Sequence, residues 1–218
     1  MHSATFVLPV WFDLGATFAF ALTGAIAGIK RGYDIVGVFF LALATGLGGG
    51  LIRDGVFLPQ TGSTALLTDP RYIGFVAAAT IAGILFSKHV KRAQRVIAII
   101  DAVGLGAYAA FGTQKALQAG LAVPAAILVG VINASGGGLL RDIITREEPL
   151  VFRPGQFYVL TALAGAATFV FLSVRLGVAA TPAAIIAIAV TFVFRALTIV
   201  FNWRTSAIAR PEDSDLTP

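Results

Sequence analysis

The residues whose spacing suggests chemistry stand in two similar stretches, GLGGGLIRDG at 46–55 and ASGGGLLRDI at 134–143. Each has three consecutive glycines, two apolar residues and then Arg-Asp, and the copies lie 88 residues apart. A glycine in a helix interior is less favourable than alanine by up to ~1 kcal/mol, so a triplet predicts a kink or an unwound turn. An unwound turn frees carbonyl oxygens, which can line a polar path for a monovalent cation.

The same glycines have a second interpretation, which is close packing between helices. Consecutive residues point around a helix, however, so a triplet cannot present all its members to one neighbour. The sequence therefore favours pore-forming breaks at Gly48, Gly49 and Gly50 and at Gly136, Gly137 and Gly138. The predicted ion pathway also includes three polar residues, Thr45, Asn133 and Ser135.

The composition is that of a membrane protein. Only 12% of the 218 residues are charged and 57% are hydrophobic, whereas about 25% of the residues in a soluble protein are charged. Seven apolar segments are long enough to span a bilayer as helices, which takes roughly 17–25 residues each. Cysteine is absent, which excludes disulfides and thiolate metal sites. We expect an all-α membrane protein with seven transmembrane helices.

The two stretches belong to a longer duplication with the same offset of 88 residues. The matched pairs are Asp13 with Asp101, Gly24 with Gly112, Arg53 with Arg141 and Asp54 with Asp142. Three helices per copy, at about 11–87 and 97–174, force the second copy to enter the membrane from the opposite side. The sequence predicts one membrane domain over 1–203. It is a 3+3 inverted-topology repeat with helices two and five broken at the glycines, a seventh helix at about 181–203 and a polar tail at 204–218.

The basic residues of the loops predict the orientation. Ten lie on one side: Lys30, Arg31, Lys88, Lys91, Arg92, Arg95, Arg146, Arg153, Arg204 and Arg210. Three lie on the other: Arg71, Lys115 and Arg175. The N-terminus is therefore expected outside and the C-terminus in the cytoplasm of a bacterium or archaeon, with the chain in the plasma membrane.

Charges within the membrane segments are expected to find partners, because an ionisable group in lipid is costly. Their depth along the helices favours two structural or gating pairs, Asp13 with Arg53 and Asp101 with Arg141. The alternative is that both arginines snorkel to the lipid headgroups unpaired.

The remaining membrane charges are assigned to the mouths and the surface. Asp54 and Asp142 are expected to line two mouths of the ion pathway and to attract cations. Arg195 is expected to snorkel or to contact lipid rather than to act as a gate, and Lys115 is expected to be an ordinary interfacial lysine, with a pore-facing charge as the alternative.

Nothing in the sequence favours an enzyme. Neither His2 nor His89 has a second metal ligand four residues away, and no Gly-Lys-Ser or Gly-Lys-Thr follows a triplet. We expect no organic cofactor and no metal beyond a permeating cation. A nucleic-acid partner is excluded because the basic residues lie in short loops next to the membrane.

Two GGGxxRD motifs in a chain of 3+3+1 helices resemble the trimeric intracellular cation channel family, in its prokaryotic branch. This branch overlaps a group of bacterial membrane proteins described as uncharacterised or as glycine transporters. The resemblance implies a homotrimer with one potassium-preferring pore per protomer, and helices two and five kinked at the glycines. The lysines that bind phosphoinositide lipid in animal members are not carried over, because Leu139, Leu140 and Arg141 follow the second triplet.

The sequence is therefore interpreted as a monovalent cation channel, chiefly for potassium. Its partners are membrane lipids, including bound lipid, and two further copies of the chain. The alternative is a secondary transporter for a small solute such as glycine, because inverted repeats with broken helices serve both functions. A third possible class of function is a lipid-binding membrane scaffold that transports nothing.

Overall fold

The computed structural model describes residues 7–59, 64–87, 93–153, 157–201 and 203, and these are helical with no strand among them. The α-helices are α1 (Trp11–Lys30), α2 (Ile35–Ile52), α3 (Ala65–Thr68), α4 (Pro70–Ser87), α5 (Ala93–Gln118), α6 (Val123–Ile144), α7 (Tyr158–Val170) and α8 (Ala180–Val200). Two π-helical turns, η1 (Arg53–Phe57) and η3 (Phe171–Arg175), extend α2 and α7. The tail predicted at 204–218 lies outside the described residues.

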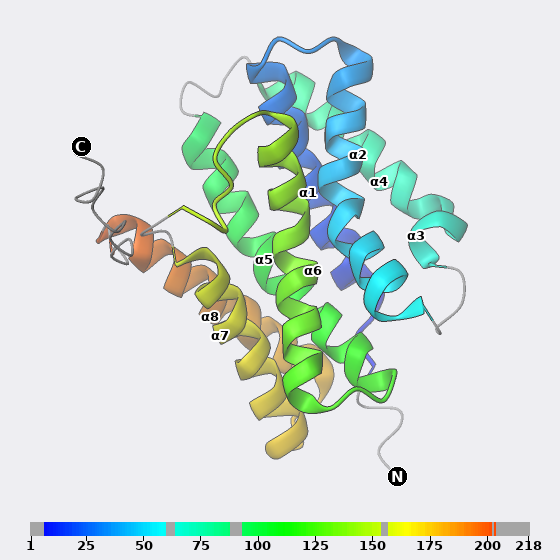
Figure 1. The fold of residues 1–218 in the computed structure, drawn as a ribbon, viewed down its shortest axis with the longest axis vertical. Helices are drawn as coiled ribbons and strands as arrows, with labels where there is room; N and C mark the ends of the chain where they lie inside the picture. Colours follow the sequence, from blue (N-terminus) through cyan, green and yellow to red (C-terminus); the bar gives the residue numbers. More distant parts are fainter. Residues whose placement is uncertain (1–6, 60–63, 88–92, 154–156, 202, 204–218) are drawn as a thin grey trace, which may run out of the picture.

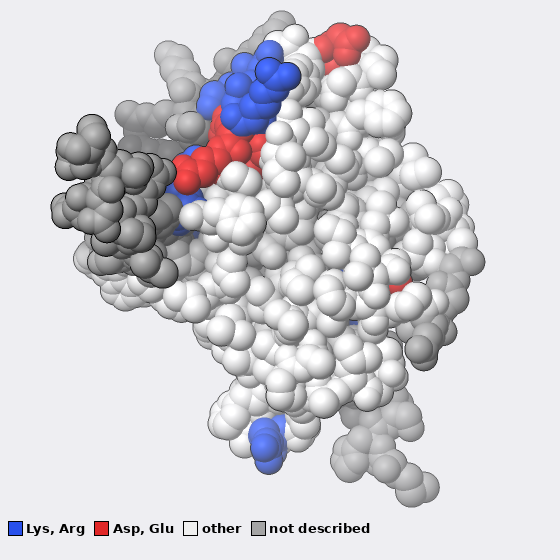
Figure 2. Space-filling view, in the orientation of Figure 1, with Lys and Arg blue, Asp and Glu red and all other residues white. Residues whose placement is uncertain are grey.

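The seven-helix expectation is confirmed. Within the described residues, six helices are long and apolar enough to cross a membrane, and α4 is a shorter apolar helix. On the face seen in Figure 2, a broad area across the middle carries only small spots of charge near its right edge, while charged side chains gather mainly at the upper end. Large apolar side chains such as Phe40, Leu85 and Val200 are exposed, as expected where a protein surface faces lipid. The chain is a multi-pass membrane protein.

The helices form two similar groups of three that run in opposite directions. In Figure 1, α1 runs upward and α2 downward, whereas their counterparts α5 and α6 run downward and upward. α1 packs on α2 and α4, and α5 packs on α6 and α7, so the contacts within each group correspond. The groups meet where α1 contacts α5 and α2 contacts α6. Helix α8 stands outside this symmetry and packs on α5 and α7.

Local signals set where several helices begin. The side chain of Asp34 accepts a hydrogen bond of 2.7 Å from the Gly37 amide and caps α2. Helix α4 begins at a proline, and the preceding Asp69 accepts bonds from the amide and guanidinium of Arg71. These hydrogen bonds lower the pKa of Asp69.

The unwound turns predicted at the glycine triplets are wrong, whereas the predicted kinks of the two helices stay a prediction. Helix α2 stays α-helical through Gly48, Gly49 and Gly50, and α6 stays α-helical through Gly136, Gly137 and Gly138. Regular hydrogen bonding in the second transmembrane segment changes only afterwards, at the π-helical turn η1. The glycines do not unwind their helices; the contacts between α2 and α6 explain their presence.

Candidate functional site

α2 and α6 touch at their glycine triplets, and we call this contact the glycine crossing. A Cβ atom added at Gly49 would collide with the carbonyl oxygen of Asn133, and one added at Gly137 would collide with that of Thr45. The two collisions are equivalent, because Asn133 is the counterpart of Thr45 at the offset of 88 residues. The two main chains are therefore in direct contact, and a side chain at either position would push the helices apart.

The other members of the triplets face different neighbours. A Cβ at Gly48 would collide with the side chain of Leu140, and one at Gly136 would lie 3.0 Å from the Cα of Gly49. A Cβ at Gly138 would lie 2.9 Å from the hydroxyl of Tyr158 in α7. Close packing, the second interpretation of the sequence, therefore accounts for Gly48, Gly49 and the second triplet, whose added Cβ atoms would each meet another helix.

Two clusters of buried charge flank the glycine crossing, and we name them the Asp54 end and the Asp142 end. At the Asp54 end, the side chain of Arg53 is 1% exposed, and its Nη1 lies 3.3 Å from Oδ1 of Asp13. The hydroxyl of Tyr72 donates a bond of 2.6 Å to the other oxygen of Asp13. The predicted pair of Asp13 with Arg53 is confirmed, and Arg53 does not snorkel.

The carboxylate of Asp54 is held by three side chains rather than left open at a mouth. Arg53 donates to both of its oxygens, at 2.7 and 3.1 Å, in a bidentate geometry. Nζ of Lys115 lies 2.8 and 2.9 Å from the same oxygens, and the hydroxyl of Thr64 donates at 2.7 Å. Lys115 is thus an ion-pair partner, and its assignment as an ordinary interfacial lysine is wrong.

The Asp142 end repeats this arrangement on the second group of helices. Nη1 of Arg141 lies 2.9 Å from Oδ1 of Asp101, which confirms the second predicted pair. Nε of Arg141 donates to Asp142 at 2.9 Å, and Nη1 donates to the hydroxyl of Thr23 at 3.0 Å. Like Arg53, Arg141 is buried and does not snorkel.

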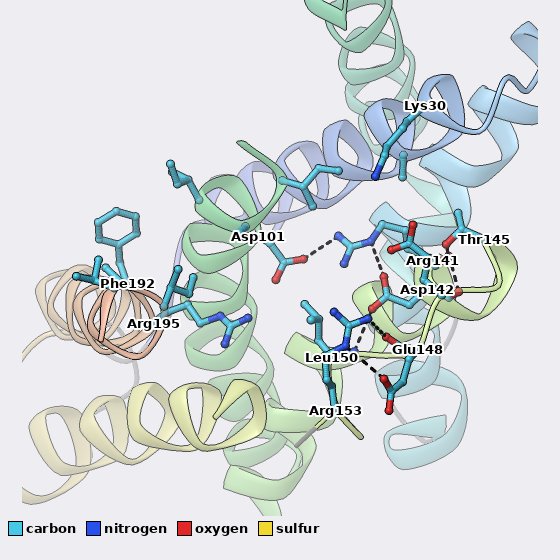
Figure 3. Close-up of a pocket in the computed structure, with 18 residues that line it drawn as sticks. Lys30, Asp101, Arg141, Asp142, Thr145, Glu148, Leu150, Arg153, Phe192 and Arg195 are labelled. Carbon is cyan, nitrogen blue, oxygen red and sulfur yellow. Dashed lines mark hydrogen bonds and ion pairs between the residues drawn. The ribbon is translucent and has the colours of Figure 1, made fainter. Parts of the chain in front are cut away.

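The two ends differ at the counterpart of Lys115. At the offset of 88 residues that counterpart is Ala27, which cannot reach Asp142 as Lys115 reaches Asp54. A cavity of about 800 Å³ opens there instead, and Ala27, Asp101, Arg141 and Asp142 are among its lining residues. Figure 3 shows Arg141 between the carboxylates of Asp101 and Asp142 in this cavity.

Helix α8 adds a second arginine to the Asp142 end. Arg195 is 2% exposed and lines the cavity, and its guanidinium carbon lies 5.2 Å from the ring centroid of Tyr158. In Figure 3 its side chain reaches from α8 toward the interior of the cavity. The expectation that Arg195 snorkels or contacts lipid is wrong, because the side chain turns into the protein.

The three polar residues of the predicted ion pathway are buried close to the glycine crossing. The hydroxyls of Thr45 and Ser135 donate to the carbonyls of Leu41 and Val131 in their own helices, at 2.6 and 2.8 Å. The amide of Asn133 donates to the carbonyl of Tyr108 at 2.8 Å and accepts from Arg53 at 3.4 Å. Their part in an ion pathway stays a prediction.

Sequence reasoning missed several members of this site. Tyr108 was not considered, although its counterpart at the offset of 88 residues is another aromatic residue, Phe20. Tyr72 was missed because the offset changes after the second helix of each repeat. For Lys115, the sequence analysis missed its pairing with Asp54. The available signal was that the equivalent residue of the first repeat, Ala27, carries no charge.

Among the described residues, no group of three or more His, Asp or Glu side chains is arranged to hold a metal ion. The arrangement can instead admit an ion or a small polar solute to the cavity and oppose its passage at the glycine crossing, where main chains touch. The site is therefore a close contact between two helices, with buried charge on both sides of it and a cavity on one side.

Comparison with known proteins gives the same architecture. A family model described as "Glycine transporter" matches residues 10–88 and 98–174. A UPF0126 membrane protein of Deinococcus radiodurans is 33% identical over 159 residues, 72% of each chain. The UPF0126 inner membrane protein YadS of Escherichia coli is 27% identical over 95% of this chain and 99% of its own. The solved TRIC trimeric intracellular cation channel orthologue of Rhodobacter sphaeroides is 32% identical over 88% of this chain and 97% of its own, with a TM-score of 0.82.

Proposed function

Because this chain belongs to the trimeric intracellular cation channel family, we propose that it is a channel for monovalent cations, chiefly potassium. The proposal includes a homotrimer with one pore in each protomer, between α2 and α6. The protein acts without an organic cofactor and without a nucleic-acid partner, and its surroundings are membrane lipids. It resides in the plasma membrane of a bacterium or archaeon, with the N-terminus outside and the C-terminus in the cytoplasm.

The observation that carries this proposal is the position of the glycine crossing between two clusters that contain acidic residues. Carboxylates along a path favour cations over anions, and at the Asp54 end they outnumber the basic partners once Lys115 leaves, because Asp13 and Asp54 then face Arg53 alone. The Asp142 end opens to a cavity of about 800 Å³, and the Asp54 carboxylate, 2% exposed, is covered by Lys115. We assign this arrangement to a closed state, since touching main chains leave no room for an ion.

Opening then requires two changes along the same path. The main chains of α2 and α6 must separate at Gly49 and Gly137, and Nζ of Lys115 must leave Asp54. Asp54 keeps Arg53 as a partner when Lys115 leaves, so its carboxylate stays ionised. Removal of the lysine therefore favours the open state without leaving a buried carboxylate alone.

Cation flux into vesicles tests the proposal. Purified protein reconstituted with a potassium or a sodium gradient should pass potassium faster. Lys115→Ala should raise potassium flux by up to about fivefold, since a partly exposed ion pair contributes up to ~1 kcal/mol. Arg71→Ala is the matched control, because it removes an exposed arginine that is paired only with its neighbour Asp69 in the described ion pairs. Equal flux in wild type and Lys115→Ala would remove the lysine from the mechanism.

The alternative is a secondary transporter for a small solute such as glycine, and the description of the matching family model favours it. Such a protein would alternate access to the cavity at the Asp142 end. Uptake of labelled glycine would then saturate with concentration and show counterflow, while potassium flux without glycine would be absent. That result would replace the channel proposal.

A further inference from the structure

Tyr108 joins the three helices that meet at the glycine crossing. Its hydroxyl donates a bond of 2.5 Å to the carbonyl oxygen of Gly46 in α2, two residues before the first triplet. Its own carbonyl oxygen, in α5, accepts a bond of 2.8 Å from the side chain of Asn133 in α6. One residue of α5 therefore bonds to both helices whose main chains touch.

The environment of Tyr108 makes these bonds strong. The side chain is fully buried, and its ring stacks on that of Phe20 with centroids 5.3 Å apart and planes 12° from parallel. Thr17 Oγ1 lies 2.7 Å from the same hydroxyl. Since water does not compete in such a site, breaking the bond to Gly46 costs the Tyr108 hydroxyl its main-chain acceptor and leaves it with Thr17 alone.

The duplication supplies an internal comparison. Phe20 is the counterpart of Tyr108, and Ala134 in α6 is the counterpart of Gly46. A phenylalanine has no hydroxyl, so no equivalent bond reaches the carbonyl of Ala134. The hydroxyl is therefore not needed for the ring to fit at this position of the fold, and its single occurrence is a difference between the two repeats.

We propose that Tyr108 is a positioning residue that holds α2 and α6 together at the glycine crossing and so stabilises the closed state. The inference rests on the proposed function, because it assigns the crossing as the barrier to ions. Movement of α2 away from α5 and α6 must break the bond from Tyr108 to Gly46, whereas the ring stack on Phe20 lies between α5 and α1 and stays intact. Tyr108→Phe, which gives the second repeat the residue of the first, should shift the equilibrium toward the open state.

Potassium flux and thiol accessibility test the inference independently. Tyr108→Phe should raise potassium flux into vesicles about three- to tenfold, the equivalent of one hydrogen bond. The chain has no cysteine, so a single Thr45→Cys substitution reports on the crossing, where Thr45 is fully buried. A small cationic thiol reagent should modify that cysteine faster by a similar factor when Tyr108→Phe is added.

Thr17→Val is the matched control, because it removes the neighbouring hydroxyl and leaves the bond from Tyr108 to Gly46 in place. It should leave both readouts near those of the wild type. If Thr17→Val raised potassium flux and labelling as much as Tyr108→Phe does, the closed state would depend on a contact with α1, and the inference would be overturned. Unchanged labelling in Tyr108→Phe would also overturn the inference. Failure of that variant to assemble would overturn it too, because it would show that the hydroxyl serves folding.

Failure of the proposed function gives a different pattern. If the wild type passes no potassium, the channel proposal fails, while the labelling rate of the cysteine at position 45 still measures separation of α2 from α6. Faster labelling in Tyr108→Phe would then support the role of Tyr108 in a transporter. Flux in the wild type with no change in labelling would keep the channel and reject the role of Tyr108.

Discussion

Gly49→Ala is the most direct test of the contact between α2 and α6. The added Cβ would collide with the main-chain carbonyl of Asn133, which cannot rotate away as a flexible side chain can. Overpacking of this kind costs about 1–3 kcal/mol. Alanine gains up to ~1 kcal/mol of helix propensity over glycine, so with the full gain the net loss of unfolding free energy should be about 0–2 kcal/mol.

Gly15→Ala is the matched control. Gly15 also lies inside a helix, α1, but a Cβ there has nothing within 4 Å. The same substitution should therefore stabilise the protein by up to ~1 kcal/mol through helix propensity alone. Because both variants gain the same helix propensity, their difference of about 1–3 kcal/mol should equal the steric cost at Gly49 alone.

The measurement is the unfolding of each purified variant in the same detergent, followed by circular dichroism. Gly137→Ala should behave like Gly49→Ala, since it meets the carbonyl of Thr45 in the equivalent way. The double variant should lose less than the sum, because helices separated by the first methyl group leave room for the second. A Gly49→Ala variant as stable as Gly15→Ala would refute the contact between the main chains and restore the unwound-turn interpretation.

Two further predictions concern the charges and the orientation. Arg53→Ala should destabilise the protein by about 3–5 kcal/mol, and adding Asp13→Asn should restore part of that loss; a coupling below ~0.5 kcal/mol in the thermal-unfolding cycle would reject the pair. Single cysteines at the exposed residues Ala122 and Glu148 should report the orientation: an impermeant thiol reagent on intact cells should label Ala122→Cys and spare Glu148→Cys, and the reverse pattern would invert the chain in the membrane.

The buried ion pairs were predictable because depth along a helix can be counted from the sequence. Asp13 and Arg53 lie near the same end of antiparallel helices, and the duplication carries that relation to Asp101 and Arg141. The bidentate bond between Arg53 and Asp54 was not predicted, since consecutive residues usually point to different sides of a helix.

The role of the glycines could not be read from one helix at a time. Three consecutive helical residues cannot all face one neighbouring helix, and this part of the prediction from the sequence was correct. In the fold, however, Gly137 faces α2 while Gly138 faces Tyr158 of α7, so each position has a neighbour of its own. Neighbouring glycines are therefore needed where more than one helix packs against the same helical turn. A helix-propensity scale describes an isolated helix and carries no information on such contacts.

Inverted repeats place equivalent helices toward both sides of a membrane, so a closed end and an open end require differences between the repeats or an element outside them. Helix α8 is such an element, and side chains at equivalent positions supply further differences. Lys115 is at the position equivalent to Ala27, and Tyr108 is at the position equivalent to Phe20, in the two repeats. The lysine covers Asp54, and the tyrosine adds a bond that only α2 receives. Both differences act on the first pore helix, which is why α2 is the element whose movement should control the path.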